Sequence, residues 1–149
     1  MIKYIGGALL IAVGWIMGQS INGIYKERVK VIERFRNFVA FCESEISFFK
    51  TEMCSVIDKF REEGNKYDDL IFDPDKKSFL RSKGTTKAIS DFFSQITLLD
   101  AENQKYFFAD TKNKIQQILE TGQKDVELKG QMAKKLLPIL AIGIFILTL

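Results

Sequence analysis

The fold of this chain is decided by residues 31–60, which read VIERFRNFVAFCESEISFFKTEMCSVIDKF. Apolar side chains recur there every three or four residues, at Val31, Phe35, Phe38, Cys42, Ile46, Phe49, Met53, Val56 and Phe60. This is the period of an α-helix with one buried face, and neither Pro nor Gly interrupts it. The sequence therefore predicts one continuous helix of about eight turns, whose apolar stripe builds the core.

The composition indicates that the rest of the chain is helical too. The 149 residues leave room for one domain of ordinary size. There are thirteen Phe but only two Pro, and the alternation typical of strands is nearly absent. We expect an all-α fold, an antiparallel helical bundle flanked by N- and C-terminal transmembrane helices.

The N-terminal segment, residues 2–25, reads IKYIGGALLIAVGWIMGQSINGIY and carries no charge between Tyr4 and Gly18. A helix of this length reaches about 33 Å, the thickness of a bilayer core. A cleaved signal peptide is the alternative, because Lys3 precedes the apolar run. Residues 16–18, Ile-Met-Gly, make a poor cleavage site, which favours a retained span.

Three glycines share the face of this segment that could approach another helix. Gly14 and Gly18 form a GxxxG spacing, and Gly7 lies two turns earlier. Small residues so spaced allow close packing of helices in lipid, although Gly is also common in membrane helices generally. We list Gly7, Gly14 and Gly18 as candidate transmembrane packing positions.

The C-terminal segment, residues 136–149, reads LLPILAIGIFILTL. Alone it gives about 21 Å of helix, and a start near residue 132 gives about 27 Å with Lys134 and Lys135 snorkelling to the interface. A buried core helix is the alternative interpretation of this segment.

Basic residues crowd the inner end of each apolar segment, at Lys26, Arg28, Lys30, Arg34 and Arg36 and at Lys124, Lys129, Lys134 and Lys135. Positive charge stays on the cytoplasmic side of membranes. The prediction is a span over residues 1–25, a cytoplasmic helical bundle over 26–135 and a span over 136–149, with both termini outside.

Turn and capping signals divide the bundle. Gly64 and Asn65 should end the long helix. Residues 66–84 are the least regular, with a short helix expected over 75–82 that Gly84 ends. Thr85 or Thr86 should cap a helix over 88–99, and Asp100 should cap a last long helix.

The residue types exclude most chemistry. A chain without His has no His-based triad or metal site, and no glycine-rich phosphate loop is present. Cys42 and Cys54, about 18 Å apart on one predicted helix, cannot pair and should face the core, which suits a reducing compartment. We expect no catalytic residue, cofactor, metal or small-molecule substrate. The mixed charges, with a net charge of +3, indicate no nucleic-acid partner.

A second surface of the long helix lies beside the core stripe. Phe41 and Phe48 are seven residues apart and flank Glu45. One interpretation is that these aromatics pack under a second helix of the same bundle. The other is that Phe41, Glu45 and Phe48 form a partner-binding patch. Glu43 lies on the opposite side, so Glu43 and Glu45 do not form an acid–base pair.

Residues 42–48, CESEISF, resemble the LExEIxY/F segment of the stage III sporulation protein AB family. Cys42 replaces the usual Leu, and Glu52-Met53 replaces a frequent Pro-Leu. Leu99-Asp100 followed by Gln104 resembles the SD…Q that begins the family's last long helix, without the preceding Gly. A third match leads into the final span, at Lys129, Met132, Lys134 and Leu136, where Ala133 and Leu137 replace Tyr and Gly. The resemblance, with these matches in the family's order, covers almost the whole chain. Residues 66–84 match poorly.

The resemblance implies a non-enzymatic platform component of the trans-envelope, secretion-like complex that links mother cell and forespore in endospore-forming bacteria. Members of this family are similar to the cytoplasmic helical domain of inner-membrane platform proteins of type II secretion. The implied partners are the lipid bilayer, other subunits of the complex and its ATPase, and the implied location is the mother-cell membrane around the forespore. A generic membrane-tethered helical adaptor and a regulatory subunit of a transporter are the alternatives.

Overall fold

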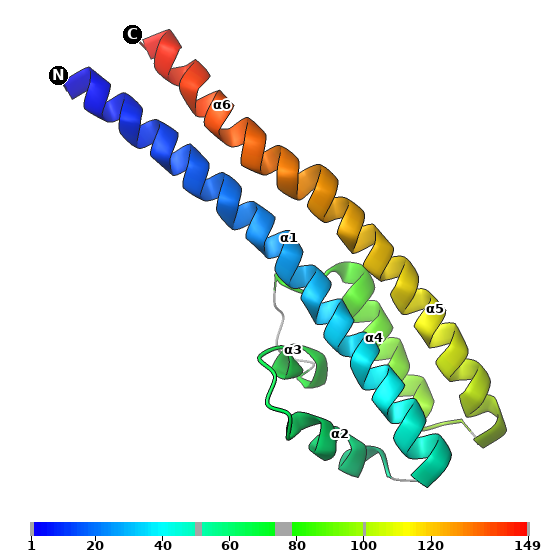
Figure 1. The fold of residues 1–149 in the computed structure, drawn as a ribbon. Coiled ribbons are helices and arrows are strands. Elements are labelled where there is room, and N and C mark those ends of the chain that lie inside the picture. Colours follow the sequence, from blue (N-terminus) through cyan, green and yellow to red (C-terminus); the bar gives the residue numbers. More distant parts are fainter. Residues whose placement is uncertain (1, 50–51, 74–78, 100, 149) are drawn as a thin grey trace. The chain divides into compact units, whose positions relative to one another are not determined.

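The computed structural model describes residues 2–49, 52–73, 79–99 and 101–148, and only the backbone of residues 2, 3, 47–49, 101, 102 and 148. Throughout these residues the regular structure is helical and no strand occurs, which confirms the all-α prediction. The helices are α1 (Ile2–Phe49), α2 (Met53–Arg61), α3 (Asp68–Phe72), α4 (Lys83–Ile96), α5 (Ala101–Asp125) and α6 (Gln131–Thr148), and a π-helical turn (Val126–Gly130) joins the last two (Figure 1).

The chain divides into two compact units. One comprises residues 28–120, and the other comprises residues 1–27 together with 121–149. The sequence prediction placed the boundaries of the bundle after residues 25 and 135. We call residues 28–120 the bundle and the other unit the helix pair.

Aromatic rings fill the core of the bundle. Phe38 is completely buried, and its ring centroid lies 4.8 Å from that of Phe72, 5.2 Å from Phe60, 5.7 Å from Phe93 and 5.9 Å from Phe92. Most of these pairs meet edge to face, the geometry that the ring quadrupoles favour. The predicted stripe does form the core, because Phe35, Phe38, Cys42, Val56 and Phe60 are all buried.

The long helix of the sequence prediction is interrupted, so the prediction of one continuous helix over residues 31–60 is wrong. α1 ends at Phe49 and α2 begins at Met53, after Glu52 in an extended conformation (φ −66°, ψ 144°). A straight helix would hold residues 38 and 60 about 33 Å apart. Folding back brings their rings to 5.2 Å and buries both, a gain in buried apolar surface that outweighs the lost helical hydrogen bonds.

The segment after α2 also differs from expectation. Gly64 has a φ of +64°, the left-handed conformation that glycine adopts after a helix, close to the predicted end. α3 lies within the region expected to be irregular. The predicted helix over 75–82 is absent at residues 79–82, and residues 74–78 lie outside the described residues.

α4 begins earlier than predicted because a different residue caps it. The Ser82 hydroxyl accepts a hydrogen bond from the backbone N–H of Thr85 at 3.2 Å, so neither Thr85 nor Thr86 is the N-cap. Gly84 therefore lies in the first turn of α4 rather than ending a helix. The predicted cap at Asp100 lies outside the described residues.

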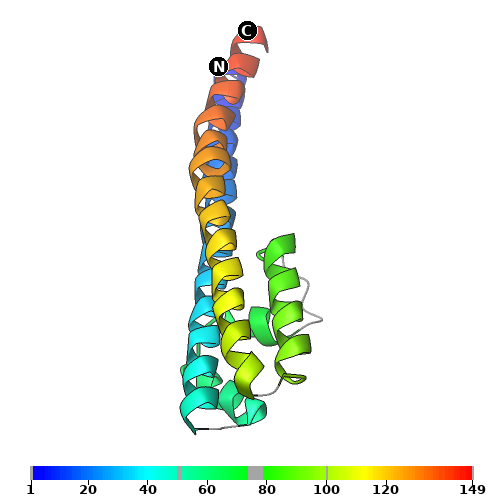
Figure 2. The same cartoon turned by 90° about the vertical axis from the view of Figure 1, so that its right-hand side faces the viewer.

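The helix pair consists of the first part of α1 and of a second segment made of the end of α5, the π-helical turn and α6. The two segments run side by side in both views (Figures 1 and 2). The helices over Tyr4–Ile46 and Asn103–Leu147 are long and apolar enough to cross a membrane. Only 11% and 6% of their most apolar 18-residue windows are buried. The C-terminal apolar segment is therefore not the buried core helix of the alternative interpretation.

Candidate functional site

Phe41 and Glu45 of the predicted patch lie on the part of α1 that faces α2. The ring centroids of Phe41 and Phe60 are 5.6 Å apart. The Lys59 Nζ donates to Glu45 Oε2 at 2.7 Å, and the Glu45 side chain is mostly buried. The Phe48 side chain lies outside the described residues. Phe41 and Glu45 thus contact a second helix of the same bundle, and their role toward a partner stays a prediction.

The neighbouring carboxylate of Glu43 engages a different helix. It forms an ion pair with Lys112 of α5. Glu43 and Glu45 therefore stabilise contacts of α1 with α5 and with α2 respectively, and the two carboxylates do not share a surface. This agrees with the sequence argument against a general acid–base pair.

The three predicted packing glycines all lie against α6. A Cβ added to Gly14 would lie 3.0 Å from the Ala141 Cβ and from the Leu137 carbonyl oxygen. A Cβ at Gly18 would lie 3.0 Å from the Ala133 carbonyl oxygen and the Lys134 Cα. At Gly7 the added atom would collide with the Phe145 ring. Each position therefore accepts a hydrogen but no side chain, unless the helices separate or Phe145 moves.

Two other glycines of α1 provide the contrast. A Cβ added to Gly6 or Gly23 would have no heavy atom of the compared set within 4 Å. The close approach is thus confined to one face of α1, the face that carries Gly7, Gly14 and Gly18. In a bilayer, an apolar helix surface is equally favourable against lipid and against another helix, so the hydrophobic effect does not drive helix pairing. Membrane helices gain contact energy instead from the close approach of their backbones, which small residues allow.

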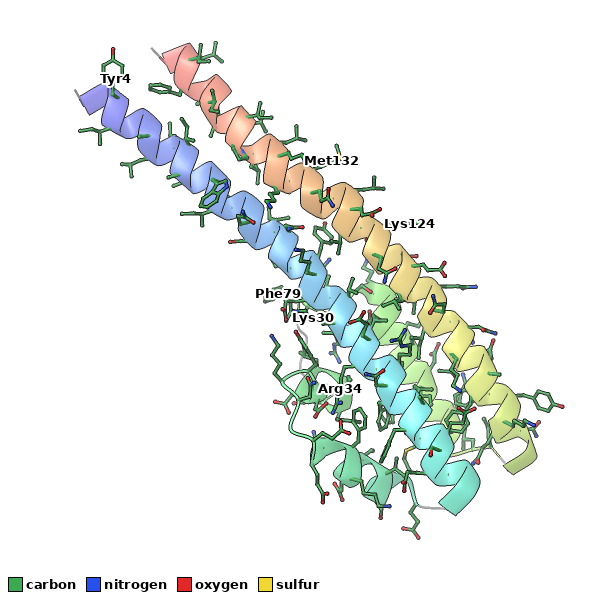
Figure 3. All side chains as sticks on the ribbon, viewed as in Figure 1. Tyr4, Lys30, Arg34, Phe79, Lys124 and Met132 are labelled. Atoms are coloured by element: carbon green, nitrogen blue, oxygen red, sulfur yellow. The ribbon has the colours of Figure 1, made fainter. Side chains whose placement is uncertain are left out.

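The outer surface of the helix pair is apolar. Large exposed apolar side chains of α1 include Tyr4, Ile5, Leu9, Trp15 and Ile16, and those of α6 include Ile139, Leu140, Ile144 and Ile146 (Figure 3, where Tyr4 is labelled). Contiguous apolar surface of this extent is rare on soluble monomers and marks a membrane or protein contact.

Arg34 has a role that the sequence analysis missed. It was counted among the basic residues flanking the membrane, yet its side chain is only 9% exposed. Its Nε donates to Asp68 Oδ1 at 2.8 Å, and one terminal nitrogen donates to Glu63 Oε2 at 2.7 Å. Its guanidinium carbon lies 3.8 Å from the centroid of the Phe60 ring (Figure 3 labels Arg34). A positional signal existed, since Arg34 is four residues before Phe38 and therefore on the core stripe.

The surroundings of Arg34 keep it charged. Burial alone would lower the pKa of Arg34, but hydrogen bonds and charge from Asp68 and Glu63 raise it overall. Stability from such a group is present below its pKa and is lost only as the pH rises through it. Because the ordinary pKa of a guanidinium is already far above neutral, Arg34 is ionised at every working pH.

The two cysteines occupy different environments. The prediction that both lie on one helix and face the core is therefore wrong. Cys42 is buried in α1, whereas Cys54 is exposed on α2, and both are free thiols. Burial raises the pKa of the Cys42 thiol, which disfavours the reactive thiolate. Neither the position nor the chemistry of Cys42 suits a nucleophile.

Groups of His, Cys, Asp and Glu that could hold a metal ion do not occur among the described residues. Comparisons with family models, with curated proteins and with solved structures found no match to this chain. The geometry of the helix pair and of the bundle, together with the resemblance of the sequence, is therefore what points to a function.

Proposed function

We propose that this chain is a two-span membrane protein whose helical bundle is a non-enzymatic scaffold for other subunits. One observation carries this proposal: Gly14 and Gly18 hold α1 against α6, while large apolar side chains cover the outside of the pair. Water would oppose exposure of so much apolar surface, at about 25 cal/mol for each Å². Lipid accepts it, and then small residues on the shared face stabilise the pair.

The same contacts support a retained first segment. Gly7, Gly14 and Gly18 lie within the stretch that a signal peptidase would remove, and all three lie against α6. Cleavage would leave the apolar α6 without this neighbour. We therefore propose that residues 1–25 remain as a span.

The proposed orientation places the bundle in the cytoplasm and both termini outside. Lys26, Lys134 and Lys135 are exposed beside the apolar segments, where the positive-inside tendency acts. Arg34 no longer supports this argument, because it is buried. Reporter fusions after residue 149 test the orientation: a periplasmic-type alkaline phosphatase should be active and a fluorescent protein that folds only in the cytoplasm should be dark. The reverse pattern would overturn it.

The finer proposal follows the resemblance of residues 42–48 and of the segments after Leu99 and Lys129 to the stage III sporulation protein AB family. In this proposal the chain is a platform component of the mother cell–forespore complex, in the mother-cell membrane. Its bundle docks the ATPase of the complex and neighbouring membrane subunits. The candidate docking surface is the edge of α1 with Phe41, Glu45 and Phe48.

A cross-linking pull-down of the full-length protein from sporulating cells tests this proposal. Recovery of an ATPase is expected, and recovery only of transporter subunits from vegetative cells would favour the transporter alternative instead. A matched pair of variants tests the surface. Glu45→Ala removes the carboxylate, whereas Lys59→Ala removes only its partner in the ion pair. Loss of binding in Glu45→Ala alone assigns the carboxylate to the partner, and unchanged binding in both Glu45→Ala and Phe48→Ala would reject the patch.

A further inference from the structure

A cavity of about 280 Å³ lies in the helix pair, at the level where the apolar segments give way to charge. Its lining comes from α1, from the π-helical turn and from the start of α6, at Asn22, Lys26, Val126, Gln131, Lys134 and Lys135. Its volume corresponds to about nine water molecules of 30 Å³ each. The cavity can therefore hold a small polar group but not a large substrate.

The charges around this cavity are positive and uncompensated. Lys26, Lys134 and Lys135 are exposed and form no ion pair within the described part of the chain. By contrast, the nearby Lys129 forms an ion pair with Asp125, at 2.7 Å. Glu127 of the π-helical turn is exposed and does not line the cavity. Three lysines thus line one cavity, and an anion bound there would balance their charge.

Asn22 forms part of the wall of this cavity. Its side chain is 7% exposed, and its Oδ1 has no hydrogen-bond partner among the described residues. The oxygen lies 2.7 Å from the position that a Cβ on Gly130 would occupy, so only glycine fits opposite it. A buried carbonyl oxygen without a donor is unfavourable. This oxygen has almost no exposed surface and packs against Gly130, so it closes the wall of the cavity and does not face a ligand.

We propose that this cavity binds the phosphate of an anionic glycerophospholipid such as phosphatidylglycerol. The phosphodiester lies against the ammonium groups of Lys26, Lys134 and Lys135. The location at the end of the apolar segments is where a lipid phosphate lies. The inference rests on the proposed membrane placement of the helix pair.

Lipid binding by the full-length protein in neutral detergent tests the proposal. Native mass spectrometry should count one retained phosphatidylglycerol, with an affinity about tenfold or more above that for phosphatidylcholine, because several lysines contribute. A combined Lys26→Gln, Lys134→Gln and Lys135→Gln variant should lose this preference. Lys124→Gln is the matched control (Figure 3 labels Lys124), since Lys124 is exposed but does not line the cavity. Equal retention of the two lipids, or an unchanged preference in the triple variant, would overturn the proposal.

A further arm separates a lipid site from a site for free phosphate. Inorganic phosphate and glycerol phosphate are added as soluble competitors. Displacement by them at the lipid's own concentration would indicate a site for a free phosphate rather than for a lipid.

The failure of this inference is distinguishable from failure of the membrane proposal. Flotation of the wild-type protein with phosphatidylcholine vesicles reports insertion without any anionic lipid. Insertion with no preference for phosphatidylglycerol rejects the lipid site alone, whereas absence from the floating fraction rejects the membrane placement. Circular dichroism and the thermal unfolding midpoint establish that each variant is folded.

Discussion

Arg34 Nε donates to Asp68 Oδ1 across 2.8 Å, and neither side chain is more than 9% exposed. This ion pair joins α1 to the first residue of α3, 34 positions later in the chain. Asp68 Oδ2 also accepts from the backbone N–H of Asn65 at 3.1 Å. One carboxylate therefore holds both the buried guanidinium and the turn that follows α2.

We predict that Asp68→Asn destabilises the protein by about 3–5 kcal/mol, because it leaves the buried charge of Arg34 without its main partner. The measurement is the urea unfolding midpoint of the full-length protein in neutral detergent, followed by the far-ultraviolet circular dichroism. Glu63→Gln is the control: Glu63 contacts the same guanidinium but is 60% exposed, so about 1 kcal/mol or less is expected. Equal losses in the two variants would contradict the argument from burial.

A second prediction concerns the aromatic core. Phe38→Ala should cost about 3–5 kcal/mol, because Phe38 is completely buried and touches rings from α2, α3 and α4. Tyr106→Ala removes an aromatic ring of similar size that is 74% exposed on α5, and it should change stability by no more than about 0.5 kcal/mol. The same urea titration compares the two, and similar midpoints would mean that the ring cluster does not hold the bundle together.

The sequence predicted the parts of the fold that depend on local periodicity. Phe35, Phe38 and Cys42 are buried as the helical spacing requires, and Gly7, Gly14 and Gly18 share one face by the same geometry. The break after Phe49 was missed because a straight helix and a folded-back one have the same apolar stripe. Only the distant contact of Phe60 with Phe38 selects between them.

The long-range polar contacts could not be predicted from the sequence for a related reason. Arg34 stands in a basic run, and nothing in the adjacent residues indicates that it meets Asp68. The cap of α4 was predicted at Thr85 or Thr86 and missed at Ser82, although Ser has the same preference for the N-cap. Intrinsic preference alone does not select among these three residues.

The cap of α4 gives a third prediction. Ser82→Ala should destabilise the bundle by about 1 kcal/mol, since the hydrogen bond from the Thr85 N–H to the Ser82 hydroxyl is lost. Ser90→Ala, at an exposed position inside α4, should have the opposite sign, because Ala is the better helix former by a few tenths of a kcal/mol. Thermal unfolding midpoints that move the same way in both variants would contradict the assignment of the cap.

The cysteines allow a fourth test. A maleimide should modify Cys54 in the folded protein within minutes, whereas Cys42 should react at least about a hundredfold more slowly, because it is buried and its raised pKa lowers the thiolate fraction. Cys54→Ser isolates the reaction of Cys42, and urea should restore its rate. Rapid modification of Cys42 in the folded Cys54→Ser protein would show that α1 is exposed there.

The last prediction concerns the helix pair, and a glycine elsewhere on α1 provides the control position. Gly14→Leu should destabilise the pair by about 1–3 kcal/mol, because a side chain there meets the Leu137 carbonyl oxygen and the Ala141 methyl group, and backbone cannot move aside cheaply. Gly6→Leu makes the same substitution where no atom of the compared set lies within 4 Å. Both variants gain the same helix propensity, so the difference between them isolates the packing term.

Trp15, the single tryptophan of the chain, provides the measurement. Its fluorescence during a titration with sodium dodecyl sulfate, starting from a neutral detergent, should report earlier separation of the helix pair in Gly14→Leu than in Gly6→Leu. Gly18→Leu should behave as Gly14→Leu does, because its added side chain meets the Ala133 carbonyl oxygen and the Lys134 backbone. If all three variants separate at one detergent ratio, the glycine face does not stabilise the pair. The proposal of two paired spans would then lose the observation that carries it.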